Sequence, residues 1–140
     1  MEINYMLVAI ATVVQFILGA VWYSFVFGKA WATIMECDDV PLEELKKAQA
    51  TMGPYYAIQF FITLLSTFVL AMFIYYLQMA NVGFHAYGVA GWIWLGFILP
   101  TQIGGVIWAN TKRKFWFKQI AISGGFQLLV LMVTAFILSM

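Results

Sequence analysis

The sequence predicts an all-α protein, a bundle of four transmembrane helices with one short amphipathic cytoplasmic helix between the first and second spans. Two observations predict this class. Hydrophobic residues make up 64% of the 140 residues and charged residues only 9%, whereas soluble domains carry about 25% charged residues. The few charges are also confined to short stretches between long uncharged runs, which is typical of integral membrane proteins. We expect a single integral membrane domain over residues 1–140.

The first uncharged run covers residues 3–28. This exceeds the roughly 20 residues that a helix needs to cross the hydrocarbon of a bilayer. From the end of this run onward, small residues recur at every fourth position: Ala20, Ser24, Gly28 and Ala32. On one continuous helix they form a stripe along which another helix can approach closely. The sequence therefore predicts helix-packing positions at Gly19, Ala20, Ser24, Gly28, Gly105 and Gly125.

Residues 29–53 form the one soluble-looking segment of the chain. Asp38 and Asp39 can cap a helix that Pro41 starts, because proline is tolerated in the first helical turn. Acidic residues come first and lysines follow, which suits the helix dipole. The pattern predicts an amphipathic helix over about 41–52 on the membrane surface, and a solvated linker helix is the alternative.

The next uncharged run, residues 48–111, is too long for one crossing at about 1.5 Å per residue. Its turn-like cluster is Ala80-Asn81-Val82-Gly83. The run therefore divides into spans of about 54–79 and 84–110, and a fourth span follows over about 117–139. Four crossings place both termini on the same side of the membrane.

A faint internal echo relates the first and third spans. Gly19, Val21, Lys29 and Trp31 match Gly104, Val106, Lys114 and Trp116 at a constant offset. Duplication of a helical hairpin explains this echo, and so does chemistry that all membrane boundaries share.

The positive charges predict the orientation. All seven Lys and Arg residues lie in the first and third loops or at the start of the last span. The positive-inside rule places these loops in the cytoplasm and both termini outside it. Cations at the ends of the spans are expected to contact lipid headgroups; they are Lys29, Lys112, Arg113, Lys114 and Lys118.

Three sequence blocks, GAVWYSFVFGKAW, MGPYYA and KFWFKQIAISGGFQLL, resemble a bacterial four-helix integral-membrane family of unknown function. The resemblance covers most of the chain. It implies the four-helix fold and a place in the bacterial inner membrane, and it brings no established activity. Family members typically carry proline after Trp-Tyr-Ser, where this chain has Phe25, and often histidine near Gln127.

Apart from Lys118 at the very start of the fourth, the predicted spans contain no Asp, Glu, Lys or Arg. Proton-coupled carriers normally keep an ionisable group at depth, so the sequence argues against proton-coupled export. One histidine, His85, and one cysteine, Cys37, indicate no metal site and no cofactor. We see no nucleophile or acid–base pair and expect no enzyme. The net charge of +1 gives no reason to expect nucleic-acid binding.

Each span instead holds one glutamine at depth: Gln15, Gln59, Gln102 and Gln127. Because an amide in hydrocarbon must find a partner, we expect all four to face the interior and to meet at intermediate depth. They can be structural, holding the helices together, or they can line a neutral polar pathway. Trp22, Tyr23 and Trp92 are candidates for stacking on a ligand in such a pathway, and packing within the bundle is the alternative.

Two functional hypotheses follow. The first is a non-enzymatic membrane protein that acts through self-assembly, most simply as a dimer, or as a subunit beside a larger membrane partner. The second is a channel or facilitator for a neutral or amphiphilic small solute, through a glutamine- and aromatic-lined interior. A sealed bundle favours the first hypothesis, and a wet cleft lined by the glutamines favours the second.

Overall fold

The computed structural model describes residues 3–109 and 111–140, and within these ranges the chain is helical without strands. In order, the elements are α1 (Tyr5–Val21), the π-helical turn η1 (Trp22–Val26), α2 (Gly28–Ile34), α3 (Leu42–Ala50), α4 (Gly53–Met79), α5 (Ala86–Ile93), the π-helical turn η2 (Trp94–Ile98), α6 (Leu99–Trp108), the 3-10 turn η3 (Arg113–Phe115) and α7 (Trp116–Leu138). Four stretches are long and apolar enough to cross a membrane: Tyr5–Val26, Gly53–Met79, Ala86–Trp108 and Arg113–Leu138. The prediction of an all-α fold with four such helices is confirmed.

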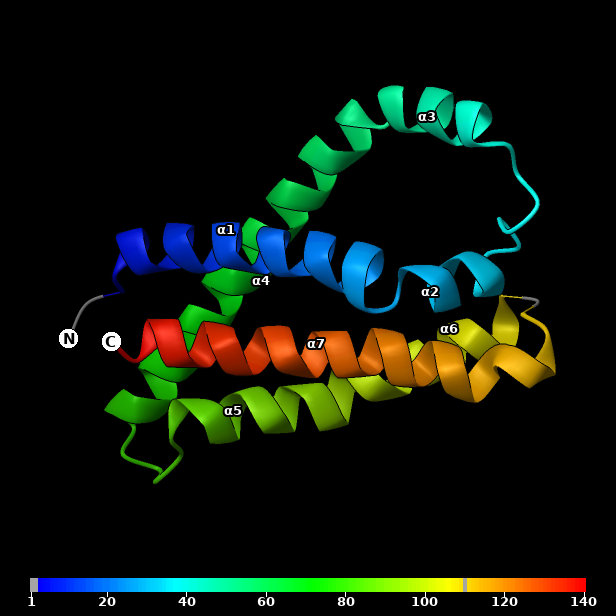
Figure 1. Cartoon of the computed structure of the whole chain (residues 1–140). Helices are drawn as coiled ribbons and strands as arrows, with labels where there is room; N and C mark the ends of the chain where they lie inside the picture. Colours follow the sequence, from blue (N-terminus) through cyan, green and yellow to red (C-terminus); the bar gives the residue numbers. More distant parts are fainter. Residues whose placement is uncertain (1–2, 110) are drawn as a thin grey trace.

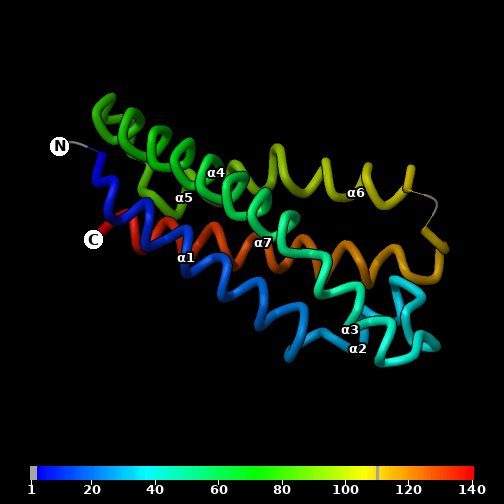
Figure 2. Tube along the Cα trace, turned by 90° about the horizontal axis from the view of Figure 1, so that it is seen from above, coloured from blue at the N-terminus to red at the C-terminus, as the bar shows by residue number. Residues whose placement is uncertain are grey.

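Helix α7 is the centre of the fold. It packs against α1 on one side and against α5 and α6 on another (Figure 1). Helix α4 runs diagonally across this layer, as the view from above shows (Figure 2). Both termini lie at one end of the molecule together with the turn between α4 and α5, and we call this the terminal end. The opposite end, which we call the basic end, carries residues 28–52 and 111–118.

The tightly packed core lies toward the terminal end. It joins α4, α5 and α7 through a cluster of buried residues: Leu70, Ile74, Ala86, Val89, Ala90 and Ala135. Ala90 and Ala135 have no exposed surface. Small residues at these positions let the helix backbones come close together, which is how helices gain packing energy when lipid removes the hydrophobic driving force.

Helix α4 leaves the bundle in its first half. Figure 1 shows the part next to α3 rising away from α1. The second half of α4 buries Thr67, Leu70, Ala71 and Ile74, whereas most side chains of residues 54–65 are exposed. On the side that faces α1, the Phe16 ring still contacts this half of α4, with its centre 5.9 Å from that of Phe60 and 6.4 Å from that of Tyr56. The bundle is therefore closed at the terminal end and open along the first half of α4.

Local sequence explains two of the boundaries. The Asn4 side-chain oxygen accepts hydrogen bonds from the backbone N–H groups of Met6 and Leu7, at 3.1 and 3.2 Å, and so caps α1. In the turn after α4, Asn81 and Gly83 adopt left-handed backbone angles, with φ of 53° and 74°. These two residue types tolerate that region best. The predicted turn at residues 80–83 is confirmed.

The structure corrects the prediction of one continuous helix over 3–28. A π-helical turn follows α1, and the chain breaks at Phe27, with φ −119° and ψ 15°. Because a π-turn adds a residue, it rotates everything beyond it by about 100°. Gly28 therefore starts a separate helix, α2, and the predicted stripe of small residues is interrupted after Ser24.

The predicted cap of the surface helix is also wrong. Helix α3 begins after Pro41, and no side chain caps it. The Asp38 carboxylate instead accepts a hydrogen bond from the Thr33 hydroxyl at 3.2 Å, which ties it back to the end of α2. The third span was expected to reach residue 110, which lies outside the described residues.

Candidate functional site

Two π-helical turns share a sequence pattern. Residues 22–26 read WYSFV and residues 94–98 read WLGFI. Both begin with tryptophan, place a small residue third and phenylalanine fourth, and end with a branched apolar residue. Each turn closes when the next backbone N–H bonds to the tryptophan carbonyl; for Trp22 the N–H is that of Phe27, at 2.9 Å. π-Turns inside helices are rare and concentrate at functional sites.

Proline explains the second of these turns. Pro100 is the second residue after η2 and stands in the first turn of α6. A proline has no N–H, and its ring crowds the carbonyl four residues earlier, which here belongs to Gly96. Widening the helix to a π-turn makes room for the ring. The first turn has no proline after it, and the chain breaks at Phe27 instead.

The two tryptophans hold α7 from two sides. The Trp22 indole N–H donates to the Ile122 carbonyl at 3.1 Å, and the Trp94 indole N–H donates to the Gly124 carbonyl at 2.8 Å. Acceptors two residues apart on an α-helix point about 200° apart. The two indoles therefore contact α7 on nearly opposite faces, at almost the same position along its axis. We call Trp22, Trp94, Ile122 and Gly124 the indole clamp.

Aromatic rings surround the clamp on the α1 side. The rings of Trp22 and Phe126 lie 6.0 Å apart, and those of Tyr23 and Phe126 5.2 Å apart. Glycine makes room for them: a methyl group at Gly19 would stand 3.3 Å from the Phe126 ring, and one at Gly125 would stand 3.8 Å from Trp22. Trp22 and Tyr23, predicted as ligand candidates, thus pack within the protein. Trp92, the third candidate, is 63% exposed on the outside of α5.

The other predicted packing positions lie outside this contact. Ala20, Ser24 and Gly105 are exposed, and a methyl group at Gly105 would meet no atom within 4 Å. Gly28 is half-buried next to the backbone of Tyr23. Of the predicted positions, Gly19 and Gly125 are the two at which α1 and α7 meet.

The structure does not bring the four glutamines together. The Gln15 amide donates to the Thr67 hydroxyl across the contact between α1 and α4, and Thr67 in turn donates to the Thr63 carbonyl. Gln59 is exposed, and its amide donates to Thr63 one turn along its own helix, at 3.3 Å. Gln102 and Gln127 are half-buried on α6 and α7. One glutamine therefore joins two helices, and another lies on the open half of α4.

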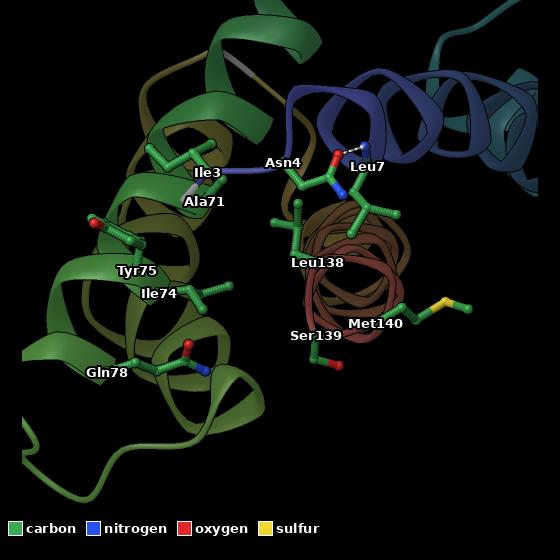
Figure 3. Close-up of a pocket in the computed structure, with 10 residues that line it drawn as sticks. All are labelled: Ile3, Asn4, Leu7, Ala71, Ile74, Tyr75, Gln78, Leu138, Ser139 and Met140. Atoms are coloured by element: carbon green, nitrogen blue, oxygen red, sulfur yellow. Dashed lines mark hydrogen bonds between the residues drawn. The ribbon is translucent and has the colours of Figure 1, made fainter. Parts of the chain in front are cut away.

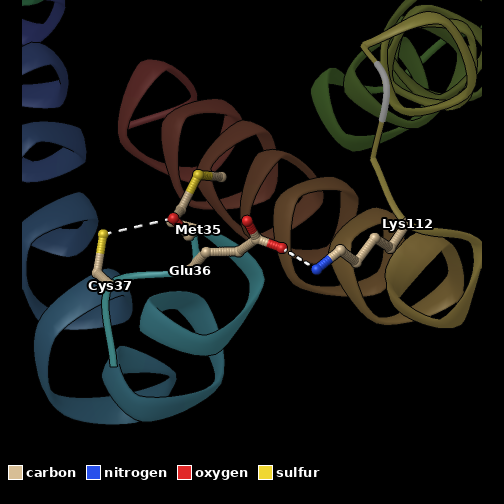
Figure 4. Close-up of polar contacts among 4 residues, drawn as sticks. All are labelled: Met35, Glu36, Cys37 and Lys112. Carbon is tan, nitrogen blue, oxygen red and sulfur yellow. Dashed lines mark hydrogen bonds and ion pairs between the residues drawn. The ribbon is translucent and has the colours of Figure 1, made fainter. Parts of the chain in front are cut away.

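The basic end joins two loops through an ion pair. Lys112, before η3, contacts the Glu36 carboxylate after α2 (Figure 4). The hydrogen bond and the charge of Lys112 lower the pKa of Glu36 below its usual value. Glu36 also adopts a left-handed backbone conformation, with φ 58°. All five predicted headgroup contacts are exposed: Lys29, Lys112, Arg113, Lys114 and Lys118.

A cavity of about 270 Å³ lies at the terminal end, between the start of α1, α4 and the end of α7 (Figure 3). Leu7, Ile74 and Leu138 give it apolar walls. In Figure 3 the Gln78 amide extends from α4 toward the end of α7, where Ser139 lies. The lining carries neutral polar groups at its rim and no charged side chain.

Sequence reasoning missed the indole clamp and the π-turns. The repeated pattern of tryptophan, any residue, a small residue and phenylalanine was a signal for them, at an offset of 94 − 22 = 72 residues. The internal echo found in the sequence pairs Gly19 with Gly104, which is a different offset, so it does not align the two π-turns. In the described ranges, no cluster of three or more His, Cys, Asp or Glu side chains could hold a metal ion.

The fold and these features define a small helical protein with four membrane-spanning-type helices around a central α7. The chain belongs to the family described as "Protein of unknown function (DUF1761)", whose model matches residues 6–139. No curated protein and no solved structure matches the chain.

Proposed function

We propose that this protein is a non-enzymatic membrane protein that acts through self-assembly, with the first half of α4 as the contact between two copies. The observation that carries this proposal is the position of Gln59. It lies about 9 Å along α4 from the first residue of the helix, on the half that diverges from the bundle, and it is exposed. Ser66 is exposed farther along the same helix.

An exposed amide just inside a membrane span gains from a polar partner. Polar groups left unsatisfied in hydrocarbon cost several kcal/mol each, and the hydrogen bond from Gln59 to Thr63 uses only one of its two N–H donors. A primary amide is self-complementary, because it has both donors and an acceptor. Two Gln59 side chains that face each other across a two-fold axis can therefore satisfy each other, as symmetric interfaces allow.

The exposed surface is large enough for a second copy to cover part of it, with lipid covering the rest. The chain exposes 9,695 Å², whereas a compact monomer of 15.9 kDa exposes about 7,400 Å². The excess of about 2,300 Å² exceeds the roughly 800 Å² that each partner buries in a standard interface. Residues 54–65 contribute to this excess of exposed surface, because few of their side chains pack against the rest of the chain.

The test is native mass spectrometry of the protein released from lipid nanodiscs. We expect a dimer for the parent chain and a dimer weakened about 3- to 20-fold for Gln59→Leu, the range that one interhelical polar contact in a membrane provides. Gln78→Leu is the matched control, since it makes the same change at an exposed glutamine at the other end of α4. A monomeric parent, or equal dimers in both variants, contradicts the proposal.

A second candidate function rests on the terminal-end cavity. Its volume of about 270 Å³ corresponds to roughly nine water molecules in liquid water, and its apolar walls and the uncharged side chains at its rim suit a short neutral amphiphile. A facilitator for such solutes would admit them here. We expect 1-octanol to raise the melting temperature of the parent chain more than octanoate or octylamine does, and Gln78→Leu to reduce the effect. Equal shifts for all three compounds contradict this candidate.

A further inference from the structure

Cations and aromatic rings lie next to one another at the basic end. Residues 112–118 read KRKFWFK, and Trp108 closes α6 just before them. Trp108 is 88% exposed and Phe117 is 85% exposed. Large rings with so little cover, next to cations and at the ends of two apolar spans, are typical of segments that lie at the level of lipid headgroups.

Internal contacts hold this loop in one conformation. The Trp116 indole N–H donates to the Thr111 carbonyl at 2.8 Å, and the Phe115 N–H donates to the Lys112 carbonyl at 2.9 Å. The Arg113 guanidinium lies 5.7 Å from the centre of the Trp116 ring. The Lys114 ammonium lies 4.7 Å from the centre of the Phe115 ring. Both cations are placed against rings of their own loop, and their N–H donors are available to an anion.

Among the described residues, one of the four cations of this segment is paired with an acid. Lys112 forms the ion pair with Glu36. The four cations, less this one carboxylate, leave a net charge of 4 − 1 = +3 on the loop. Arg113, Lys114 and Lys118 are all exposed, so an anion reaches them without any rearrangement of the fold.

We propose that this loop is a binding site for the phosphate of an anionic phospholipid, with Arg113, Lys114 and Lys118 as the phosphate ligands. The exposed rings of Trp108 and Phe117 lie beside the lipid in the interfacial layer. Arginine provides a planar set of donors and lysine a point charge, and both bind phosphate oxygens. The ion pair between Glu36 and Lys112 limits the charge of the site and joins it to the loop after α2.

Lipid titration tests this proposal. The melting temperature of the detergent-solubilised protein is measured with increasing phosphatidylglycerol, and separately with phosphatidylcholine. We expect saturable protection by phosphatidylglycerol alone. The double variant Arg113→Gln/Lys114→Gln should bind it about 30-fold more weakly, since each cation near an anionic surface contributes a factor of about five.

The matched control is Lys46→Gln/Lys47→Gln, which removes the same two charges from α3 and should change binding less than twofold. Glu36→Gln frees Lys112 and should tighten phosphatidylglycerol binding about fivefold. Because this substitution lies outside the loop, it tests the proposal even if the Arg113→Gln/Lys114→Gln variant does not fold. Equal losses in the two double variants, equal protection by phosphatidylcholine, no effect of Glu36→Gln, or the same protection by inorganic phosphate alone each overturns the proposal.

Discussion

Two indole N–H groups determine how α7 is held by its neighbours. Trp22 and Trp94 donate to carbonyls that α7 already uses in its own helical bonds, and a carbonyl oxygen has a second lone pair for this purpose. A buried indole N–H without an acceptor would cost free energy. The clamp therefore fixes both the depth and the rotation of α7 relative to α1 and α5.

Substituting either clamp tryptophan should destabilise the fold. For Trp22→Phe and for Trp94→Phe we expect a loss of about 0.6–1.5 kcal/mol in the free energy of unfolding, the usual contribution of one such hydrogen bond. Unfolding in mixed micelles with increasing denaturing detergent measures it. Trp92→Phe removes the same atoms from an exposed position and serves as the control. If Trp92→Phe costs as much as the other two, the indole hydrogen bonds contribute nothing.

The ion pair at the basic end gives a dependence on pH. The lowered pKa of Glu36 means that the folded state prefers the carboxylate. The stabilisation is therefore present above the ordinary pKa of 4.5 and is lost as the pH falls through the lower folded value. An NMR titration should give a Glu36 pKa below 4.5 in the parent and a higher one in Lys112→Gln. Lys46→Gln should leave it unchanged, and an unchanged value in Lys112→Gln would refute the pairing.

At the scale of the elements, a break in helical regularity accompanies each hydrogen bond of the clamp. The π-turns η1 and η2 stand where α1 and α5 would otherwise continue as regular helices. An added residue changes which side chains face α7 beyond that point. The first turn separates α2 from the span, and the second accommodates Pro100. Both turns begin at the tryptophan that bonds to α7, so the same residue starts the break and makes the contact.

The packing of α1 on α7 predicts different outcomes for two glycines. Gly19→Leu should destabilise the fold by about 1–3 kcal/mol, because the new side chain would collide with Phe126, which leaves only 3.3 Å even for a methyl group. Gly105→Leu has open space around it and should be tolerated. Unfolding in mixed micelles measures both variants. Equal losses would mean that the contact between α1 and α7 is not close-packed at Gly19.

At the scale of the whole molecule, the sequence predicted the number of long apolar helices, the turn at residues 80–83 and the short helix between the first two spans. These features depend on local hydrophobicity, charge and turn residues, which a single sequence displays directly. The divergence of α4 and the placement of Gln59 depend on contacts between distant segments. The stripe of small residues was predicted for a helix with a regular repeat. The π-turn η1 breaks that repeat, so neither η1 nor the interruption after Ser24 could be predicted in this way.

The orientation of the protein in the membrane is also a property of the whole molecule. The positive charges lie at the basic end, so we expect this end in the cytoplasm and both termini outside it. With Cys37→Ser as background, a cysteine at Glu43 should resist a membrane-impermeant thiol reagent added to intact cells, and a tag at the C-terminus should be accessible from outside. Labelling at position 43 without access to the tag would reverse the orientation.

The most direct test of self-assembly through α4 is disulfide cross-linking between copies in lipid vesicles. In the Cys37→Ser background, Ile62→Cys places a thiol one turn along α4 from Gln59 and leaves the amide in place, and Trp92→Cys places one on the exposed side of α5. Helices that pack lie about 8–10 Å apart, so self-assembly through α4 predicts a covalent dimer at position 62 under mild oxidation, maintained when the protein is diluted with lipid, and none at position 92. Equal cross-linking at both positions, or none at position 62, would contradict it.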